Sequence, residues 1–413
     1  MVNQPYGGRL VERFSPRDPD PSMRRIEVRR TYALDAEKIG IGAYSPLEGF
    51  MTSPELQSVL RRNELGNGLP WTIPVVLGVQ AKPEEGDQVL LTWGGRPLAI
   101  LEVEETFSWD KRDFAEAVYG TLDPEHPGVV QVMNMEDFLV GGRITLISRI
   151  TSDSTPMEVR EEFSRRGWKR IAAYQTRNPP HRAHEHVQRH ALELVDGLFI
   201  HPVVGELKGD DFPPQAILEA YSFLVENFYP REVVILDTLT ITMRYAGPKA
   251  AVFLATVRKN YGCTHYIVGR DMAGVGSYYD PYAAQRLLTQ LNPGIELLPY
   301  PEVYYCRRCE GTVTEKTCCH REEWVKISMT KVRQMLRQGL EPPREMIRPE
   351  VASILGKYLR GDPDQGKTSA SDRLGHWESF SLRIGFRGHT IPISGSSQLM
   401  HLSWGLEYSL VTK

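Results

Sequence analysis

One short segment, residues 175–184, contains two histidines, two arginines and two side-chain amides. His181 and His184 are three positions apart, so in a helix they share one face. The preceding run, residues 169–174, predicts a strand, so the segment lies where a strand ends and a helix begins. A helix N-terminus offers unpaired N–H groups and a positive dipole end. The segment therefore predicts an anion site. Histidines that only cap and pack a helix would not explain the arginines and amides beside them.

A second segment, residues 269–276, is rich in glycine and follows another predicted strand, residues 264–268. Glycines let a backbone approach a ligand closely. Arg270 can pair with phosphate oxygens, and Asp271 can hold that arginine or a ribose hydroxyl. A plain glycine-rich turn is the alternative, but the position after a parallel strand favours binding.

A third segment, residues 327–333, predicts the start of a helix. Ser328 or Thr330 can cap this helix. The N–H groups of its first turn, together with Lys331 and Arg333, could hold a polyphosphate. An ordinary capped helix fits the same residues, so this segment alone does not decide between the two interpretations.

Four of the five cysteines lie close together, and a histidine follows them directly: Cys306, Cys309, Cys318, Cys319 and His320. The spacing of the first pair is typical of a zinc site, and a third cysteine with a nearby histidine completes a tetrahedral set. The predicted ligands are Cys306, Cys309, Cys318 and His320, with Cys319 as a competitor for the fourth position. Four protein ligands close a site, so the predicted metal is structural. Reduced cysteines without a metal are the alternative.

One literal motif is set aside. Residues 361–368 read GDPDQGKT and fit the pattern of a phosphate-binding P-loop. However, a working P-loop follows a buried strand, and the segment before this one reads as the end of a helix. Two aspartates would repel phosphate, Pro363 has no N–H, and the stretch after Thr368 is too short for a kinase domain. We interpret the match as chance.

The elements that must position these residues follow from the apolar pattern. After Pro156, predicted strands alternate with predicted helices, which indicates a doubly wound parallel sheet with ligands at the carboxyl ends of its strands. The strands are 169–174, 197–204, 232–236, 264–268 and 295–300, and the helices are 183–195, 214–228, 249–260 and 282–290.

The first part of the chain predicts a different domain. Short β-type runs at 71–77, 88–92, 98–103 and 144–150 indicate a compact, barrel-like β domain, with a turn that carries buried aromatics at 44–51. The chain of 413 residues suggests two or three domains at about 150 residues each. The net charge of −3 gives no basic field for nucleic acid. The N-terminus lacks the layout of a signal peptide, and no apolar run reaches the roughly 18 residues of a membrane span. We therefore expect a cytoplasmic protein without nucleic-acid or membrane partners.

Together these motifs resemble the ATP sulfurylase, or sulfate adenylyltransferase, family. The resemblance covers most of residues 1–356 and rests on SPLEGFM at 45–51, the run at 175–184, HPVVG at 201–205, MRYAGP at 243–248, GRDMAG at 269–274 and SMTKVR at 328–333. It implies an α/β chain with an N-terminal PUA-like β domain at 1–155, a Rossmann-like nucleotidyltransferase domain with a parallel sheet at 156–300, and a small zinc-containing C-terminal subdomain at 301–356. The tail at 357–413 matches nothing in the family, and its role is unknown.

The resemblance also implies site residues. Sulfate is expected at Gln175, Arg177 and Ala273. ATP is expected at Gln175, Thr176, Arg177, Asn178, His181, His184, Gly269, Arg270, Asp271, Met272 and Val303. Thr176, Arg177 and Asn178 are regarded as active in the family, and His181 and His184 join them in the predicted catalytic set. Mg²⁺ with ATP, a structural Zn²⁺ and a homo-oligomeric state are expected as well.

Three positions depart from the family pattern. Many members have histidine where this chain has Met272, and methionine cannot donate a hydrogen bond. Met329 replaces a residue that is usually small, and Cys319 stands where proline is common. Some relatives carry an adenylylsulfate kinase domain after the shared region, for which this tail is too short.

The predicted reaction converts ATP and sulfate to adenosine 5′-phosphosulfate and pyrophosphate, reversibly, by in-line attack of sulfate on the α-phosphorus. Sulfate is already an anion, so catalysis should come from positioning and from charge stabilisation. Arg177 and Gln175 would hold sulfate, His181 and His184 the leaving phosphates, and Asn178 with Arg270 the α-phosphate. The physiological direction, assimilatory or dissimilatory, stays open.

Two other functions compete with this prediction. A nucleotidyltransferase with another acceptor, such as a phosphorylated alcohol or nicotinate mononucleotide, can also use paired histidines at a strand–helix junction. The flanking Gln175, Thr176, Arg177 and Asn178 argue against it. The other competitor is a zinc-containing binding module that has lost catalysis, which only Met272 and Met329 support.

Overall fold

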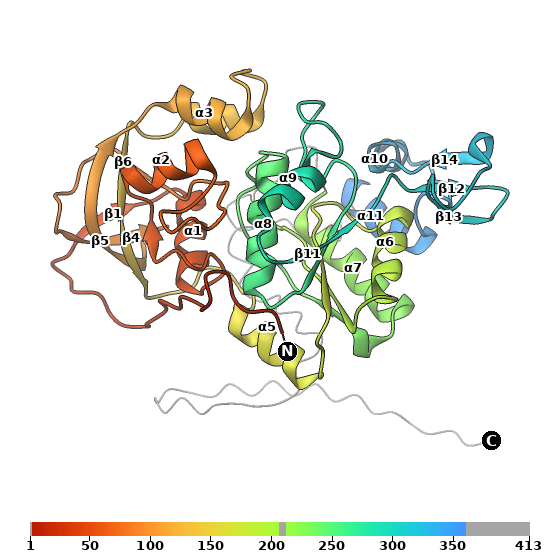
Figure 1. The fold of residues 1–413 in the computed structure, drawn as a ribbon, viewed down its shortest axis with the longest axis horizontal. Coiled ribbons are helices and arrows are strands. Elements are labelled where there is room, and N and C mark those ends of the chain that lie inside the picture. Colours follow the sequence, from red (N-terminus) through yellow and green to blue (C-terminus); the bar gives the residue numbers. More distant parts are fainter. Residues whose placement is uncertain (1, 206–211, 361–413) are drawn as a thin grey trace. The chain divides into compact units, whose positions relative to one another are not determined.

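The computed structural model describes residues 2–205 and 212–360. A mixed sheet dominates the N-terminal part, with strand order β1-β4-β5-β6-β2 and with β3 paired to β6 (Figure 1). Its strands are β1 Arg24–Glu27, β2 Gly49–Phe50, β3 Leu77–Val79, β4 Gln88–Trp93, β5 Arg96–Ser108 and β6 Phe138–Leu146. Its helices are α1 Arg30–Gly40, α2 Ser53–Arg62, α3 Lys111–Tyr119 and α4 Pro127–Met133. The sequence pattern predicted strands here but missed these helices.

Two predicted N-terminal strands are wrong in their bounds. Of the run at 71–77 only Leu77 is in a strand, although every residue of the run is buried. There the indole of Trp71 donates to the carbonyl of Ile73 at 2.7 Å, so the segment closes on itself locally. The run predicted at 144–150 is also too late, because β6 ends at Leu146. The predicted turn with buried aromatics is confirmed, since Tyr44 and Phe50 are both buried.

The predicted parallel sheet is confirmed. Its order is β11-β10-β7-β8-β9, and every pair is parallel. The strands are β7 Ile171–Tyr174, β8 Gly197–Ile200, β9 Val234–Leu236, β10 His265–Val268 and β11 Glu296–Pro299. The helices that alternate with them are α5 Pro156–Arg165, α6 Arg182–Leu192, α7 Pro214–Phe228, α8 Pro248–Asn260 and α9 Ala283–Leu291, with the short helix η1 Arg231–Val233 before β9.

The central strand β7 is buried on both faces of this sheet. Ile171 and Ala173 pack into one hydrophobic core, whereas Ala172 and Tyr174 pack into a second. Successive side chains of a strand point to opposite faces, so an uninterrupted apolar run is what a sheet covered on both sides requires. The carboxyl end of β7 is therefore held firmly between its neighbours β10 and β8.

A small three-stranded antiparallel sheet follows the parallel sheet along the chain, in the order β13-β12-β14. Its strands are β12 Tyr304–Cys306, β13 Gly311–Val313 and β14 Trp324–Lys326, with the short helix η2 Arg321–Glu323 before β14. Two helices, α10 Met329–Arg337 and α11 Pro349–Arg360, complete this part and bury Val332, Leu336 and Leu355 in the second core. The P-loop-like match at 361–368 and most of the tail lie outside the described residues.

None of the helices within 2–205 and 212–360 combines the length and the apolarity needed to cross a membrane.

Candidate active site and metal centre

The turn after β7 is closed by its own side chains. Thr176 is buried, and its Oγ1 accepts from the N–H of Asn178 at 3.0 Å. The carbonyl of Thr176 accepts from the N–H of Val203 at 2.8 Å, which ties this turn to the chain that follows β8. The Oε1 atom of Gln175 accepts from the hydroxyl of Tyr266 at 2.9 Å. The acceptor end of the amide is thus occupied, and its N–H₂ group remains to donate.

His181 and His184 form a stacked pair at the start of α6. Their ring centroids lie 3.6 Å apart, with 28° between the planes. His181 is the N-cap of α6, and its Nδ1 accepts from the backbone N–H of His184 at 3.4 Å. An Nδ1 that accepts carries no proton, so the proton of the neutral ring is on Nε2, which can donate to a ligand.

Both imidazoles of this pair are neutral in the free protein. Burial lowers the pKa of His181 to about 4. Burial, and then the neighbouring His181, lowers the pKa of His184 well below its usual range. Nδ1 of His184 also lies 3.1 Å from the hydroxyl of Tyr221, which fixes the ring in place. The pair therefore meets an anion first as hydrogen-bond donors and not as cations.

Arg177 connects the turns after β7 and β10. Its Nη2 donates to the carbonyl of Gly274 at 2.9 Å. Its guanidinium carbon lies 5.5 Å from the ring centroid of Tyr245. Its Nη1 is buried and has no hydrogen-bond partner among the described residues. An unsatisfied buried donor on a cation costs free energy, so this group is poised for an anionic ligand.

The glycine-rich turn after β10 has a backbone that few residues accept. Asp271 and Ala273 have left-handed φ angles of 55° and 56°. A Cβ on Gly274 would lie 2.0 Å from Oδ1 of Asp271, so a larger residue there would displace the Asp271 carboxylate. Burial raises the pKa of the Asp271 carboxyl, and the opposing effects of Arg270 and Arg177 show that both cations are near. The predicted residues of the two turns thus lie together at one edge of the sheet.

The other predicted ATP residues lie around this turn. Nε of Arg270 is 3.5 Å from the carboxylate of Glu302, which also binds Lys326 at 3.2 Å. A Cβ at Gly269 would meet nothing within 4 Å, so space is open there. Met272 is half-buried and packs against the first core, and Val303 is buried in the second.

The third predicted segment begins α10. Oγ of Ser328 accepts from the N–H of Lys331 at 3.4 Å, so Ser328 and not Thr330 caps this helix. The guanidinium of Arg333 lies 5.3 Å from the ring of Phe212. A polyphosphate site at this helix start stays a prediction.

Three tyrosines of the site were not predicted as site residues. Tyr221 and Tyr266 are buried and read as core aromatics in a helix and a strand, and Tyr245 lies in the motif at 243–248, which carried the family resemblance but no assigned role. Buried tyrosines usually need a partner for the hydroxyl, but the sequence does not say which one.

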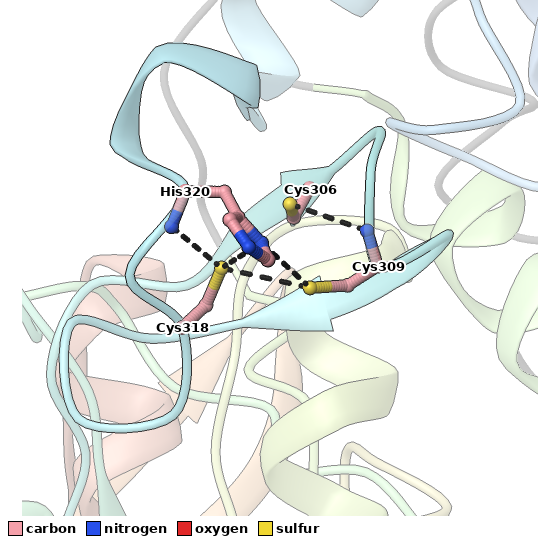
Figure 2. Close-up of side chains that lie close together, drawn as sticks. All are labelled: Cys306, Cys309, Cys318 and His320. Carbon is pink, nitrogen blue, oxygen red and sulfur yellow. Dashed lines mark hydrogen bonds between the residues drawn. The ribbon is translucent and has the colours of Figure 1, made fainter.

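The predicted metal ligands converge in space. The side chains of Cys306, Cys309, Cys318 and His320 point toward one another (Figure 2), and their ligand atoms all lie within 4.8 Å of one another. Sγ of Cys309 lies 3.6 Å from Sγ of Cys318 and 3.4 Å from Nδ1 of His320. A tetrahedral Zn²⁺, with Zn–S of about 2.3 Å and Zn–N of about 2.0 Å, holds two sulfurs about 3.8 Å apart and a sulfur and a nitrogen about 3.5 Å apart. The donor set therefore fits a metal such as zinc.

The surroundings of the cluster support a thiolate. The indole N–H of Trp324 donates to Sγ of Cys318 at 3.3 Å, and this bond, together with hydrogen bonds from His320, Cys309 and Cys306, lowers the pKa of that thiol to about 6. Backbone N–H groups of Cys309 and His320 donate to Sγ of Cys306 and of Cys318. Cys319 is exposed and is not one of the four converging residues.

Comparisons with known proteins place the chain in a family. A model of the ATP-sulfurylase family matches residues 151–358, and one of the PUA-like domain matches residues 3–149. The chain is similar to curated proteins named sulfate adenylyltransferase. The one from Aeropyrum pernix is 46% identical over 86% of this chain and 98% of its own length, and the one from Symbiobacterium thermophilum is 45% identical over 86% and 96%.

A solved structure, the hexameric APS kinase from Thiobacillus denitrificans, has a similar fold with a TM-score of 0.70. It is 25% identical and covers 86% of this chain and 69% of its own. The predicted domain limits at 155, 300 and 356 stay predictions beside the matched spans. Identity to the curated relatives over most of both chains, with the matched family model, means that this chain belongs to the ATP-sulfurylase family.

Proposed function

We propose that this protein is a sulfate adenylyltransferase that transfers AMP from ATP to sulfate and releases pyrophosphate. The observation that carries the proposal is the edge of the parallel sheet where Arg177, with a buried and unpaired N–H, shares a turn with the neutral pair His181 and His184. The relatives named sulfate adenylyltransferase support the acceptor. The reaction is reversible, and its physiological direction is not part of the proposal.

Sulfate binds Arg177, Gln175 and the backbone of Ala273. Nη1 of Arg177 gains an acceptor, which it lacks among the residues that the structure describes. The amide N–H₂ of Gln175 faces the ligand because Tyr266 occupies its oxygen. These groups hold sulfate in line with the α-phosphorus, and no base is needed because sulfate is already ionised.

The histidine pair binds the phosphates that leave as pyrophosphate. Nε2–H of His181 donates to a phosphate oxygen, and charge that develops there raises the pKa of a ring that starts near 4. Asn178, with Thr176 closing its turn, and Arg270 support the α-phosphate, and Arg270 exchanges part of its contact with Glu302 for the ligand. The remaining nucleotide contacts are assigned to Gly269, Asp271, Met272 and Val303. Mg²⁺ would accompany ATP and would supply positive charge that offsets the charge of the phosphates.

The cluster at Cys306, Cys309, Cys318 and His320 is proposed to hold a structural Zn²⁺. All four positions are filled by protein atoms, so the ion takes no part in the reaction and stabilises the small antiparallel sheet. A homo-oligomeric state and a cytoplasmic location are proposed from the sequence alone.

The test is pyrophosphate release from ATP and Mg²⁺, with and without sulfate, in the presence of inorganic pyrophosphatase. We expect release that depends on sulfate and that Arg177→Lys largely abolishes, because a lysine cannot reproduce the fork of Arg177. Release that depends instead on a phosphorylated alcohol or on nicotinate mononucleotide would reassign the acceptor. A folded protein that binds ATP and releases nothing would refute the proposal.

A further inference from the structure

A histidine of the N-terminal domain contacts a tyrosine that follows the glycine-rich turn after β10. His126 is fully buried at the start of α4, and its Nδ1 accepts from the N–H groups of Gly128 at 3.1 Å and of Val129 at 3.4 Å. Both partners are backbone donors, so Nδ1 has no proton and the neutral ring carries its proton on Nε2. Nε2 lies 3.2 Å from the hydroxyl of Tyr279. The imidazole is therefore the donor and the Tyr279 oxygen the acceptor.

The hydroxyl of Tyr279 in turn donates a hydrogen bond to the backbone of the catalytic domain. It lies 3.2 Å from the carbonyl of Tyr245, and a carbonyl can only accept. The order of donors is thus fixed along the chain of groups, from Nε2–H of His126 to the Tyr279 oxygen and from the Tyr279 hydroxyl to the Tyr245 carbonyl. No rotation of the Tyr279 hydroxyl satisfies both of these bonds in another way.

The carbonyl at the end of this chain belongs to an unusual backbone. Tyr245 has a left-handed φ of 52°, which is costly for a bulky aromatic residue. Gly247 follows with a φ of 49°, and a Cβ there would lie 2.4 Å from the ring of Tyr279. Tyr279 thus holds this segment both by a hydrogen bond to its carbonyl and by packing against its glycine.

The segment matters because the ring of Tyr245 faces Arg177. The guanidinium carbon is 5.5 Å from the ring centroid, and Nη2 is fixed on the carbonyl of Gly274. With one nitrogen bonded and the aromatic ring beside the guanidinium, the remaining N–H groups keep one direction. A shift of the Tyr245 backbone would release that restraint while leaving Arg177 itself intact.

We propose that His126 and Tyr279 are positioning residues for the oxyanion substrate, which act through the Tyr245 backbone on Arg177. This inference rests on the proposed function, because it assigns Arg177 to sulfate. The N-terminal domain thus contributes to substrate binding, although His126 lies far from Arg177 along the sequence.

Two substitutions test the chain of groups without removing its packing. Tyr279→Phe keeps the ring over Gly247 and removes only the hydroxyl. His126→Asn keeps a side-chain acceptor that caps α4, but it is too short to reach Tyr279. Tyr278→Phe is the matched control: it removes the hydroxyl of the neighbouring tyrosine, which bonds to Asp123 and not to Tyr245.

We expect Tyr279→Phe and His126→Asn each to raise the KM for sulfate about fivefold to tenfold, the effect of losing one ordinary hydrogen bond. The KM for ATP and kcat should change by less than about twofold. The double variant should be no worse than the single ones, because both break the same chain of groups. Tyr278→Phe should leave both KM values unchanged.

Three outcomes would overturn the inference: an unchanged KM for sulfate in both variants, a parallel rise of the KM values for sulfate and ATP, or an equal effect of Tyr278→Phe. Thermal melting shows whether each variant folds. If one of the two single variants does not fold, the KM of the other for sulfate tests the inference. Wild-type protein without sulfate-dependent turnover would refute the proposed function itself, whereas active wild-type protein with unaffected variants refutes only this inference.

Discussion

His181 has two tasks that substitution can separate. Its Nδ1 caps α6, and its Nε2–H is free for a phosphate. His181→Asn keeps a capping side chain and loses the donor, whereas His181→Ala loses both. We expect both variants to lose about 100-fold or more in turnover, the effect of removing one donor to developing negative charge. Only His181→Ala should also lose about 1 kcal/mol of stability, as helix N-cap removal does. Turnover and urea unfolding of both variants check this, and near-normal turnover of folded His181→Asn would contradict the phosphate role.

Because the stacked histidines are neutral in the free protein, we expect the protein to take up protons when it binds pyrophosphate. The pKa of His181 is lowered to about 4, and that of His184 is also lowered, because burial disfavours the charged rings. Bound phosphate favours the charged form, so binding must raise these pKa values and draw protons from solution. Calorimetric titration with pyrophosphate near pH 6, in two buffers of different ionisation enthalpy, should show this uptake. His181→Asn should take up fewer protons, and identical heats in both buffers for the wild-type protein would contradict the prediction.

The same lowered pKa values make stability depend on pH with a definite sign. Between about 6.5, where an unfolded histidine titrates, and about 4, the unfolded chain binds protons that the folded protein excludes. Each imidazole therefore contributes stability above that window, and the contribution is lost as the pH falls through it. The effect belongs to the free protein, because bound phosphate would raise the folded pKa and reduce the loss.

At the scale of elements, the strands with a regular apolar pattern could be predicted from the sequence, whereas helices and hydrogen bonds that depend on tertiary contacts could not. Strands buried on both faces are uninterrupted apolar runs, so the parallel sheet and the turns at its edge could be predicted. Helix α1 could not, because it buries Asp35, Glu37 and Lys38, and charged residues usually mark an exposed face. The run at 71–77 is apolar because its side chains are buried in the core, but only its last residue belongs to a strand. The hydroxyl partners of Tyr221 and Tyr279 also appear only in the fold.

The small antiparallel sheet contacts helix α6 directly. Nδ1 of His186 on α6 lies 2.9 Å from Oγ1 of Thr312 on β13. The proposed metal joins the loops of the same sheet, with ligands on both sides of β13. Stripping the metal should therefore loosen the support of α6 as well as the sheet.

We expect about one zinc per chain, and Cys318→Ser should lose it, because a closed structural site needs all four ligands. The melting temperature of this variant should fall, and its turnover should fall as well. Cys319→Ser is the matched control, since Cys319 is the adjacent, exposed cysteine outside the cluster. Metal analysis of Cys319→Ser and of His320→Ala decides between His320 and Cys319 as the fourth ligand. Zinc loss from Cys319→Ser with retention in His320→Ala would reverse the assignment.

At the scale of the whole chain, buried ion pairs join the N-terminal domain to the catalytic domain. Lys38 of α1 lies 2.7 Å from Asp153, and both side chains are buried. Asp153 also accepts from the hydroxyls of Thr238 and Thr240, in the segment after β9. Burial alone would raise the pKa of Asp153, but Lys38 and these hydrogen bonds outweigh it and lower that pKa. Buried charges persist only when they are paired and hydrogen-bonded, so this network fixes how the two domains meet.

The second such pair allows a decisive experiment. Nη2 of Arg244 binds both carboxylate oxygens of Asp35, at 2.5 and 2.6 Å, and Asp35 is only 1% exposed. Asp35→Asn leaves the Arg244 charge buried without a counter-ion, which should cost about 3–5 kcal/mol of unfolding free energy. Asp113→Asn is the control, because Asp113 pairs with the exposed Arg61 and such pairs contribute about 0–1 kcal/mol. Urea unfolding of the two variants measures the difference.

A double variant should restore the stability without restoring the binding of sulfate. Asp35→Leu combined with Arg244→Met removes both charges, and an apolar pair of similar volume often restores the stability that a broken ion pair loses. Arg244 directly precedes Tyr245, whose ring faces Arg177, so the restored protein should still bind sulfate more weakly than the wild type. If the double variant regains both stability and the wild-type KM for sulfate, the ion pair only joins the domains. If it regains stability alone, the contact between the domains also shapes the active site.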